Sequence, residues 1–136
     1  MYPPELVAPM KKELTDVGFE ELTTPDAVDK AITAEGTTLV IINSVCGCAA
    51  ANARPAARIA ITNDKRPNRI TTVFAGVDPE AVAQARKYML PYPPSSPSMA
   101  LFQNGKLVHF VERHHIEGRP AEMIAENLAA AFNEFC

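Results

Sequence analysis

The sequence predicts an α/β protein in which helices cover both faces of a four-stranded mixed sheet, as a three-layer sandwich. Two observations support this prediction. Residues 37–45 (TTLVIINSV) are almost continuously apolar, which is typical of a central strand buried on both faces. From there onward the patterns follow the order strand, helix, strand, helix, strand, strand, helix. The first two strands are connected by a helix and should be parallel, whereas the last two form an antiparallel hairpin.

A helical extension is expected before this core. Residues 5–17 carry apolar side chains at helical spacing, although Pro9 lies inside the pattern and should kink the helix or mark its start. Residues 24–26 (TPD) begin a second helix with a capping hydroxyl, a proline and an acid in the first turn. We therefore expect a single domain over the whole chain, with residues 1–36 as the N-terminal extension and residues 37–136 as the core.

The remaining core elements follow from local signals. The alanine-rich stretch after Cys48 favours a helix, which Pro55 should kink. Residues 70–75 (ITTVFA) indicate a strand, and residues 78–80 (DPE) begin the next helix. The strands 99–103 and 106–111 are joined by Asn-Gly, a strong hairpin signal, and the last helix covers residues 120–135.

Composition and charge exclude several classes of protein. The net charge is −3, so nothing indicates nucleic acid or an anionic membrane as a partner. The apolar runs are far shorter than the ~20 residues that span a bilayer, and the N-terminus has no signal-peptide pattern. We expect a cytoplasmic protein. In a reducing cytoplasm the closely spaced cysteine pair indicates catalysis or metal binding rather than a structural disulfide.

That pair, Cys46 and Cys48, comes where the central strand ends and the next helix begins. The free N–H groups and the positive dipole of a helix start favour a thiolate, so the pKa of Cys46 should be lowered. Gly47 gives the backbone freedom that a bond between the two sulfurs would need. The small ring should be strained, and strained disulfides are readily reduced. The spacing therefore favours transient disulfide exchange.

Two other interpretations of the pair remain open. Cys46 and Cys48, with His114 or His115, could hold zinc or an iron–sulfur cluster, although the cysteines are closer together than most zinc-binding pairs. They could also be two inert, buried thiols.

Two further segments are expected beside the cysteines. The ends of the parallel strands and the start of an antiparallel one share one sheet edge, so Ser96 and Pro97 should face Cys46. Pro97 is either a cis-proline that shapes a docking site or an ordinary trans turn proline. The last strand ends at the same edge, where Arg113 or His114 could stabilise a thiolate or simply be solvated.

Three other residues are expected to lie away from the chemistry. Arg54 and Arg58, on the helix after the cysteines, are interpreted as surface charges. Cys136 ends a helix that begins at the cysteine edge and runs ~24 Å from it, at 1.5 Å per residue. Cys136 is therefore expected to be a spectator thiol, or to join two copies in a homodimer.

Several segments of the sequence resemble the bacilliredoxin family. They include EGTTLVIINSVCGCAA, ARPAA, TVFAGVD, PSSPSMALF and LVHFVERHHIEG, and together they extend over nearly the whole chain. The resemblance implies a thioredoxin-like fold and thiol–disulfide exchange. It also implies that client proteins carrying the low-molecular-weight thiol bacillithiol are the substrates, with no cofactor and no metal.

The resemblance assigns roles residue by residue. Cys46 would attack the mixed disulfide and take the thiol, and Cys48 would resolve the adduct. Pro97 would be the cis-proline and, with Ser96 and Gly47, would form the substrate-binding surface. In contrast to ordinary thioredoxins, one residue separates the cysteines, Val45 precedes them in place of an aromatic residue, and no acid lies in the strand before them. A disulfide isomerase with an oxidising CGC disulfide and a metal or iron–sulfur carrier are the alternative functions.

Overall fold

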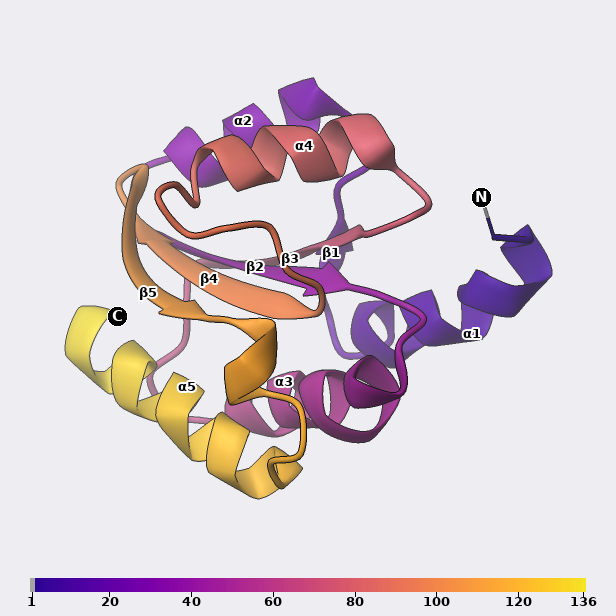
Figure 1. Ribbon diagram of the computed structural model, residues 1–136. Coiled ribbons are helices and arrows are strands. Elements are labelled where there is room, and N and C mark those ends of the chain that lie inside the picture. The colour runs from indigo at the N-terminus through magenta and orange to yellow at the C-terminus, as the bar shows by residue number, and fades with distance from the viewer. Residues whose placement is uncertain (1) are drawn as a thin grey trace.

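The computed structural model describes residues 2–136 as a five-stranded mixed sheet between two layers of helices (Figure 1). The strands are β1 (Glu20–Glu21), β2 (Thr37–Asn43), β3 (Arg69–Phe74), β4 (Ser98–Gln103) and β5 (Lys106–Val111). Their spatial order is β1-β3-β2-β4-β5. β2 is parallel to β3 and antiparallel to β4, and β4 is antiparallel to β5. The predicted three-layer α/β/α sandwich is confirmed.

The fifth strand is the one difference in the sheet. β1 pairs in parallel with β3, through Glu20 with Thr71 and Glu21 with Thr72. A strand of two glutamates has no apolar periodicity, so no pattern in the sequence predicts it. The N-terminal extension therefore contributes an edge strand to the sheet in addition to its helices.

Helices cover the two faces of the sheet unequally. They are α1 (Pro4–Thr15), α2 (Pro25–Thr33), α3 (Arg54–Ala60), α4 (Pro79–Lys87) and α5 (Ala121–Phe135). α2 and α4 lie on one face, and α1, α3 and α5 lie on the other (Figure 1). The Thr24 hydroxyl caps α2 by accepting a hydrogen bond from the Ala27 N–H at 3.1 Å, as expected. None of the helices within residues 2–136 is long and apolar enough to cross a membrane.

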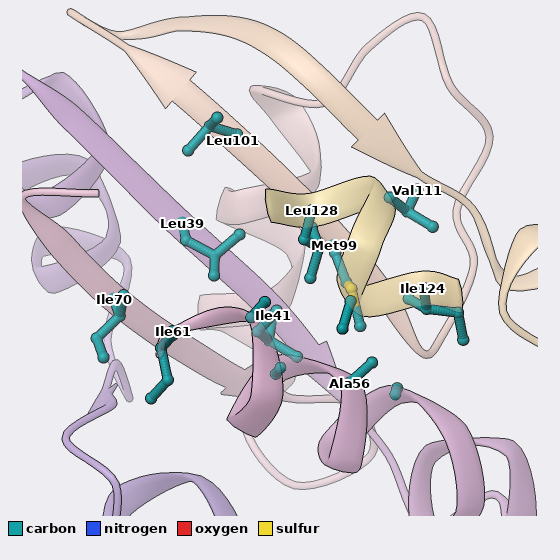
Figure 2. Packing of buried hydrophobic residues seen from close by; sticks show 14 of the residues in the cluster. Leu39, Ile41, Ala56, Ile61, Ile70, Met99, Leu101, Val111, Ile124 and Leu128 are labelled. Atoms are coloured by element: carbon teal, nitrogen blue, oxygen red, sulfur yellow. The ribbon is translucent and has the colours of Figure 1, made fainter. Parts of the chain in front are cut away.

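The central strand β2 separates two apolar clusters, and all of its residues are buried. Leu39 and Ile41 face α3 and α5, whereas Val40 and Ile42 face α2 and α4. Figure 2 shows the first cluster, in which side chains of α3 and α5 pack against the sheet. Because both faces of β2 are covered, the strand holds its carboxyl end in a fixed position.

The strand register places the expected segments at one edge of the sheet. Asn43, at the end of β2, pairs with Phe74 at the end of β3. Ser98, at the start of β4, pairs with Ile42, and Val111 at the end of β5 pairs with Met99. The loops that follow β2, β3 and β5 and the loop that precedes β4 therefore emerge together.

Candidate active site

The two cysteines lie in the loop between β2 and the helix that follows it. Cys46 is half-buried, Cys48 is buried, and both are free thiols. Residues Ala49–Ala53 form a π-helical turn, and α3 begins at Arg54. The change of helical geometry thus lies just before Pro55, which has no N–H to donate within the helix. The position of Cys46 at a strand-to-helix junction agrees with the prediction.

The Cys46 sulfur receives two donors. The backbone N–H of Cys48 points at Cys46 Sγ with a distance of 3.4 Å, and Nη2 of Arg113 lies 3.3 Å from the same sulfur. The Cys46 N–H in turn donates to the Ser44 hydroxyl at 3.2 Å. Two N–H donors on a sulfur favour its thiolate form and so lower its pKa.

The pKa values of the two cysteines shift in opposite directions. The Cys48 thiol and then its backbone N–H donate to Cys46 and lower the pKa of Cys46, and the charge of Arg113 lowers it further, against the effect of burial. Burial, followed by the interaction with Cys46, raises the pKa of Cys48. The expected lowering of the Cys46 pKa is present: its largest cause is the Cys48 thiol, and the backbone N–H groups of Cys48 and Ala49, at the start of the helical segment, add to it. Of the two thiols, Cys46 therefore loses its proton more readily and Cys48 retains its proton more readily.

Gly47 does not adopt the left-handed conformation, and a Cβ at this position would meet no atom within 4 Å. The reduced loop therefore does not require glycine for its backbone. The missing side chain instead leaves the surface between the two cysteines open.

The loop before β4 also lies beside Cys46 and Arg113. The peptide bond between Ser96 and Pro97 is cis. The Ser96 carbonyl accepts from Nη1 of Arg113 at 3.3 Å, and the Ser95 hydroxyl accepts from the Arg113 N–H at 3.4 Å. Arg113 therefore ties this loop to Cys46.

Arg113 and the two histidines have different surroundings. Arg113 lies in a short 3-10 turn after β5, where its side chain is exposed and also contacts the Cys46 sulfur, so the two interpretations left open for it hold together. His114 and His115 are exposed, and the structure groups them with Glu112 as possible metal ligands. Within residues 2–136 that group contains neither Cys46 nor Cys48, so the geometry does not favour a cysteine–histidine metal site.

Arg54 is not a surface charge, and that interpretation was wrong. It is 1% exposed, and its Nη1 donates to Asn43 Oδ1 at 3.0 Å and to the Ser44 carbonyl at 2.9 Å. Its Nε lies 3.1 Å from a carboxylate oxygen of Glu13 in α1, although it is not aligned to donate to it. Asn43 also donates to the Met10 carbonyl at 3.3 Å. A buried guanidinium thus fixes the turn that precedes Cys46.

A hollow of about 300 Å³ opens in front of Cys46. Its lining includes Ser96, Arg113, Gly76 and Tyr2. A Cβ on Gly76 would lie 2.6 Å from the Tyr2 ring, so the ring packs closely against this glycine. No sequence signal links residue 2 to the cysteines, and the tyrosine was missed for that reason.

Asp78, at the start of α4, makes no capping hydrogen bond, and burial raises the pKa of its carboxyl group. Its Oδ2 is buried without a partner among the described residues.

Cys136 is exposed and follows α5 on the opposite side of the molecule from the loop after β2 (Figure 1).

Comparisons with known proteins agree with this geometry. The family described as disulphide isomerase matches residues 2–136. A bacilliredoxin of Cytophaga hutchinsonii is 60% identical over 134 residues, which cover 98% of this chain and 99% of the relative. A bacilliredoxin of Halalkalibacterium halodurans is 54% identical over 136 residues, with 99% and 94% covered.

Solved structures with low sequence identity share the fold. A putative oxidoreductase with a thioredoxin fold has a TM-score of 0.64 at 17% identity, covering 79% of this chain and 90% of that one. Mitochondrial thioredoxin 3 of Saccharomyces cerevisiae has a TM-score of 0.61 at 14% identity, covering 90% and 98%. The fold is therefore thioredoxin-like. The chain belongs to the bacilliredoxin family of thiol–disulfide oxidoreductases.

Proposed function

We propose that this protein removes a low-molecular-weight thiol, such as bacillithiol, from mixed disulfides on client proteins in the cytoplasm, with Cys46 as the nucleophile. The observation that carries the proposal is the environment of Cys46 Sγ. This sulfur is half-buried at the edge of an open hollow, and it faces both the Cys48 N–H and the Arg113 guanidinium.

The proposed reaction has two exchanges. The Cys46 thiolate attacks the sulfur of the small thiol, a new disulfide joins the two, and the client sulfur leaves as a thiolate that takes up a proton. Cys48 then gives up its proton and attacks Cys46 Sγ, the small thiol leaves, and a Cys46–Cys48 disulfide forms. An external thiol or dithiol reduces this disulfide for the next cycle.

Three neighbouring residues are proposed to receive the substrate. Ser96 lines the hollow and Pro97 follows it directly before β4, so the backbone of these two residues is close enough to Cys46 to contact a client chain. Gly47 has no side chain to obstruct the approach to Cys46.

The test follows the transferred thiol by intact mass spectrometry. Reduced protein is mixed with a client that carries a bacillithiol mixed disulfide, using the wild type and the variants Cys46→Ala, Cys48→Ala and Cys136→Ala. We expect Cys48→Ala to accumulate the thiol on Cys46, Cys46→Ala to be inactive, and Cys136→Ala to behave as wild type. Release of the thiol by Cys46→Ala would show that another group is the nucleophile.

Disulfide isomerisation is the second candidate, and the description of the matching family favours it. In that reaction Cys46 attacks a non-native protein disulfide, and Cys48 frees the enzyme if the client does not rearrange. Reactivation of a scrambled disulfide protein by the wild type but not by Cys46→Ala would support it. If the wild type removes the small thiol but does not reactivate the scrambled protein, only the first function is supported.

A further inference from the structure

Arg113 holds a position from which it can contact both the nucleophile and a captured thiol. Its Nη2 lies 3.3 Å from Cys46 Sγ, its Nη1 lies 3.3 Å from the Ser96 carbonyl, and its Nε lies 2.9 Å from a carboxylate oxygen of Glu117. A guanidinium carries five N–H donors. These contacts occupy only part of them, and the side chain is 45% exposed.

The charge on the sulfur changes during the reaction. While Cys46 is a thiolate, Arg113 faces an anion. Once Cys46 has formed a disulfide with the small thiol, the sulfur is neutral and Nη2 has lost its anionic partner. A carboxylate on the captured thiol, a few bonds from its sulfur, would give Nη2 an anionic partner again.

The hollow suits a ligand of that size. Its volume of about 300 Å³ is at the small end of ligand pockets. Arg113 and Tyr2 both line it, together with Cys46. Arginine is well matched to carboxylates because its planar fork can donate two parallel hydrogen bonds.

We infer that Arg113 recognises a carboxylate on the low-molecular-weight thiol, so that the preferred substrates are mixed disulfides of carboxylate-bearing thiols. This inference rests on the proposed function. The ion pair between Arg113 and Glu117 does not prevent it, because both side chains are exposed and such pairs are weak. Glu117 instead competes with the ligand for the same guanidinium.

The test uses two small thiols that differ in a single group. A client protein with one cysteine is converted to its mixed disulfide with 3-mercaptopropionate or with the neutral amide of the same length, 3-mercaptopropionamide. The second-order rate of transfer to reduced protein is measured for each, and the ratio of the two rates is divided by the ratio found with dithiothreitol. Because both rates use the same Cys46, a change in its nucleophilicity cancels in the ratio.

We expect the wild type to prefer the carboxylate by about tenfold, the size of one charge-assisted hydrogen bond. Arg113→Gln should bring the ratio close to one, and Arg113→Lys should retain part of it. Glu117→Gln, which removes the competitor, should increase the ratio. Arg119→Gln, which removes an exposed cation from the same loop, is the matched control and should leave the ratio unchanged.

The possible outcomes distinguish a failure of this inference from a failure of the proposed function. A wild-type ratio near one, with both thiols transferred to Cys46, would overturn the inference and leave the proposed function standing. Absence of transfer from either substrate would instead remove the proposed function. An equal fall in the ratio for Arg113→Gln and Arg119→Gln would show a general effect of charge and would also overturn the inference.

Discussion

Replacement of Arg54 by methionine tests whether the buried guanidinium holds the loop that carries Cys46. Methionine keeps most of the length of the side chain but removes the charge and all donors. The Ser44 carbonyl would lose its 2.9 Å partner, whereas Asn43 Oδ1 would keep the Ser44 N–H at 2.9 Å. A hydrogen bond from a charged donor contributes about 1.5–3 kcal/mol. Because only the Ser44 carbonyl is left without a partner, most of the lost stability comes from that carbonyl.

The free energy of unfolding should fall by about 3 kcal/mol in Arg54→Met, since breaking a buried charged contact costs about 3–5 kcal/mol and the Glu13 partner is 36% exposed. Urea unfolding of the reduced protein, followed by circular dichroism, measures this change. Arg58→Met is the matched control, because Arg58 is exposed on the same helix. Its change should stay within about 0.5 kcal/mol. Equal stability of the two variants would refute the structural role of Arg54.

Four other results are expected. Alkylation of Cys46 by iodoacetamide should have a pH midpoint below that of an ordinary thiol, and Arg113→Gln should raise it; no difference between the two proteins would contradict the contact. Thr24→Ala removes the cap of α2 and should lower the free energy of unfolding by about 1 kcal/mol in urea. Phe132→Ala, at a fully buried position, should lower it by about 3–5 kcal/mol. Gly105→Ala should cost about 1 kcal/mol, because φ is +84° in the hairpin turn.

The pH dependence of stability has a definite sign for Cys46. Its pKa is lower in the folded than in the unfolded protein, so the folded state favours the thiolate. The resulting stabilisation is complete above the unfolded pKa and is lost as the pH falls through the folded pKa. Cys48, whose pKa is raised, has the opposite sign, and its contribution is lost as the pH rises through the folded pKa. The variant Cys48→Ala removes the Cys48 contribution together with the largest cause of the Cys46 shift, so both parts of the pH dependence should become smaller.

Local patterns were enough to predict most of the fold. The apolar run of β2 indicated a central strand, and the Asn-Gly turn at 104–105 indicated the hairpin. The rule that a helix connects parallel strands then placed Cys46, Pro97 and the end of β5 at one edge of the sheet. These predictions succeeded because each depends on periodicity, turn chemistry or the order of the elements, and all three can be obtained from the sequence without knowledge of distant contacts.

The features that were missed depend on contacts between distant segments. Arg54 was interpreted as a surface charge because arginine on a helix is usually solvated, and only the arrangement of α1 and the end of β2 around it shows otherwise. That the exposed Arg113 also contacts the thiol likewise follows only from its distance to Cys46 Sγ. Tyr2 lies more than forty residues from the cysteines in sequence, and no pattern joins them.

The contacts of Glu13 and Met10 make α1 a structural support of the reactive loop. A fragment of residues 37–136 would retain the central strand, both cysteines and the cis-proline loop. It would leave Arg54 without its carboxylate and Asn43 without the Met10 carbonyl. Because energetic coupling is reciprocal, any change that the captured thiol imposes on this loop also acts on α1. Protection of the α1 amides from hydrogen exchange would then report the redox state of a cysteine more than thirty residues away in sequence.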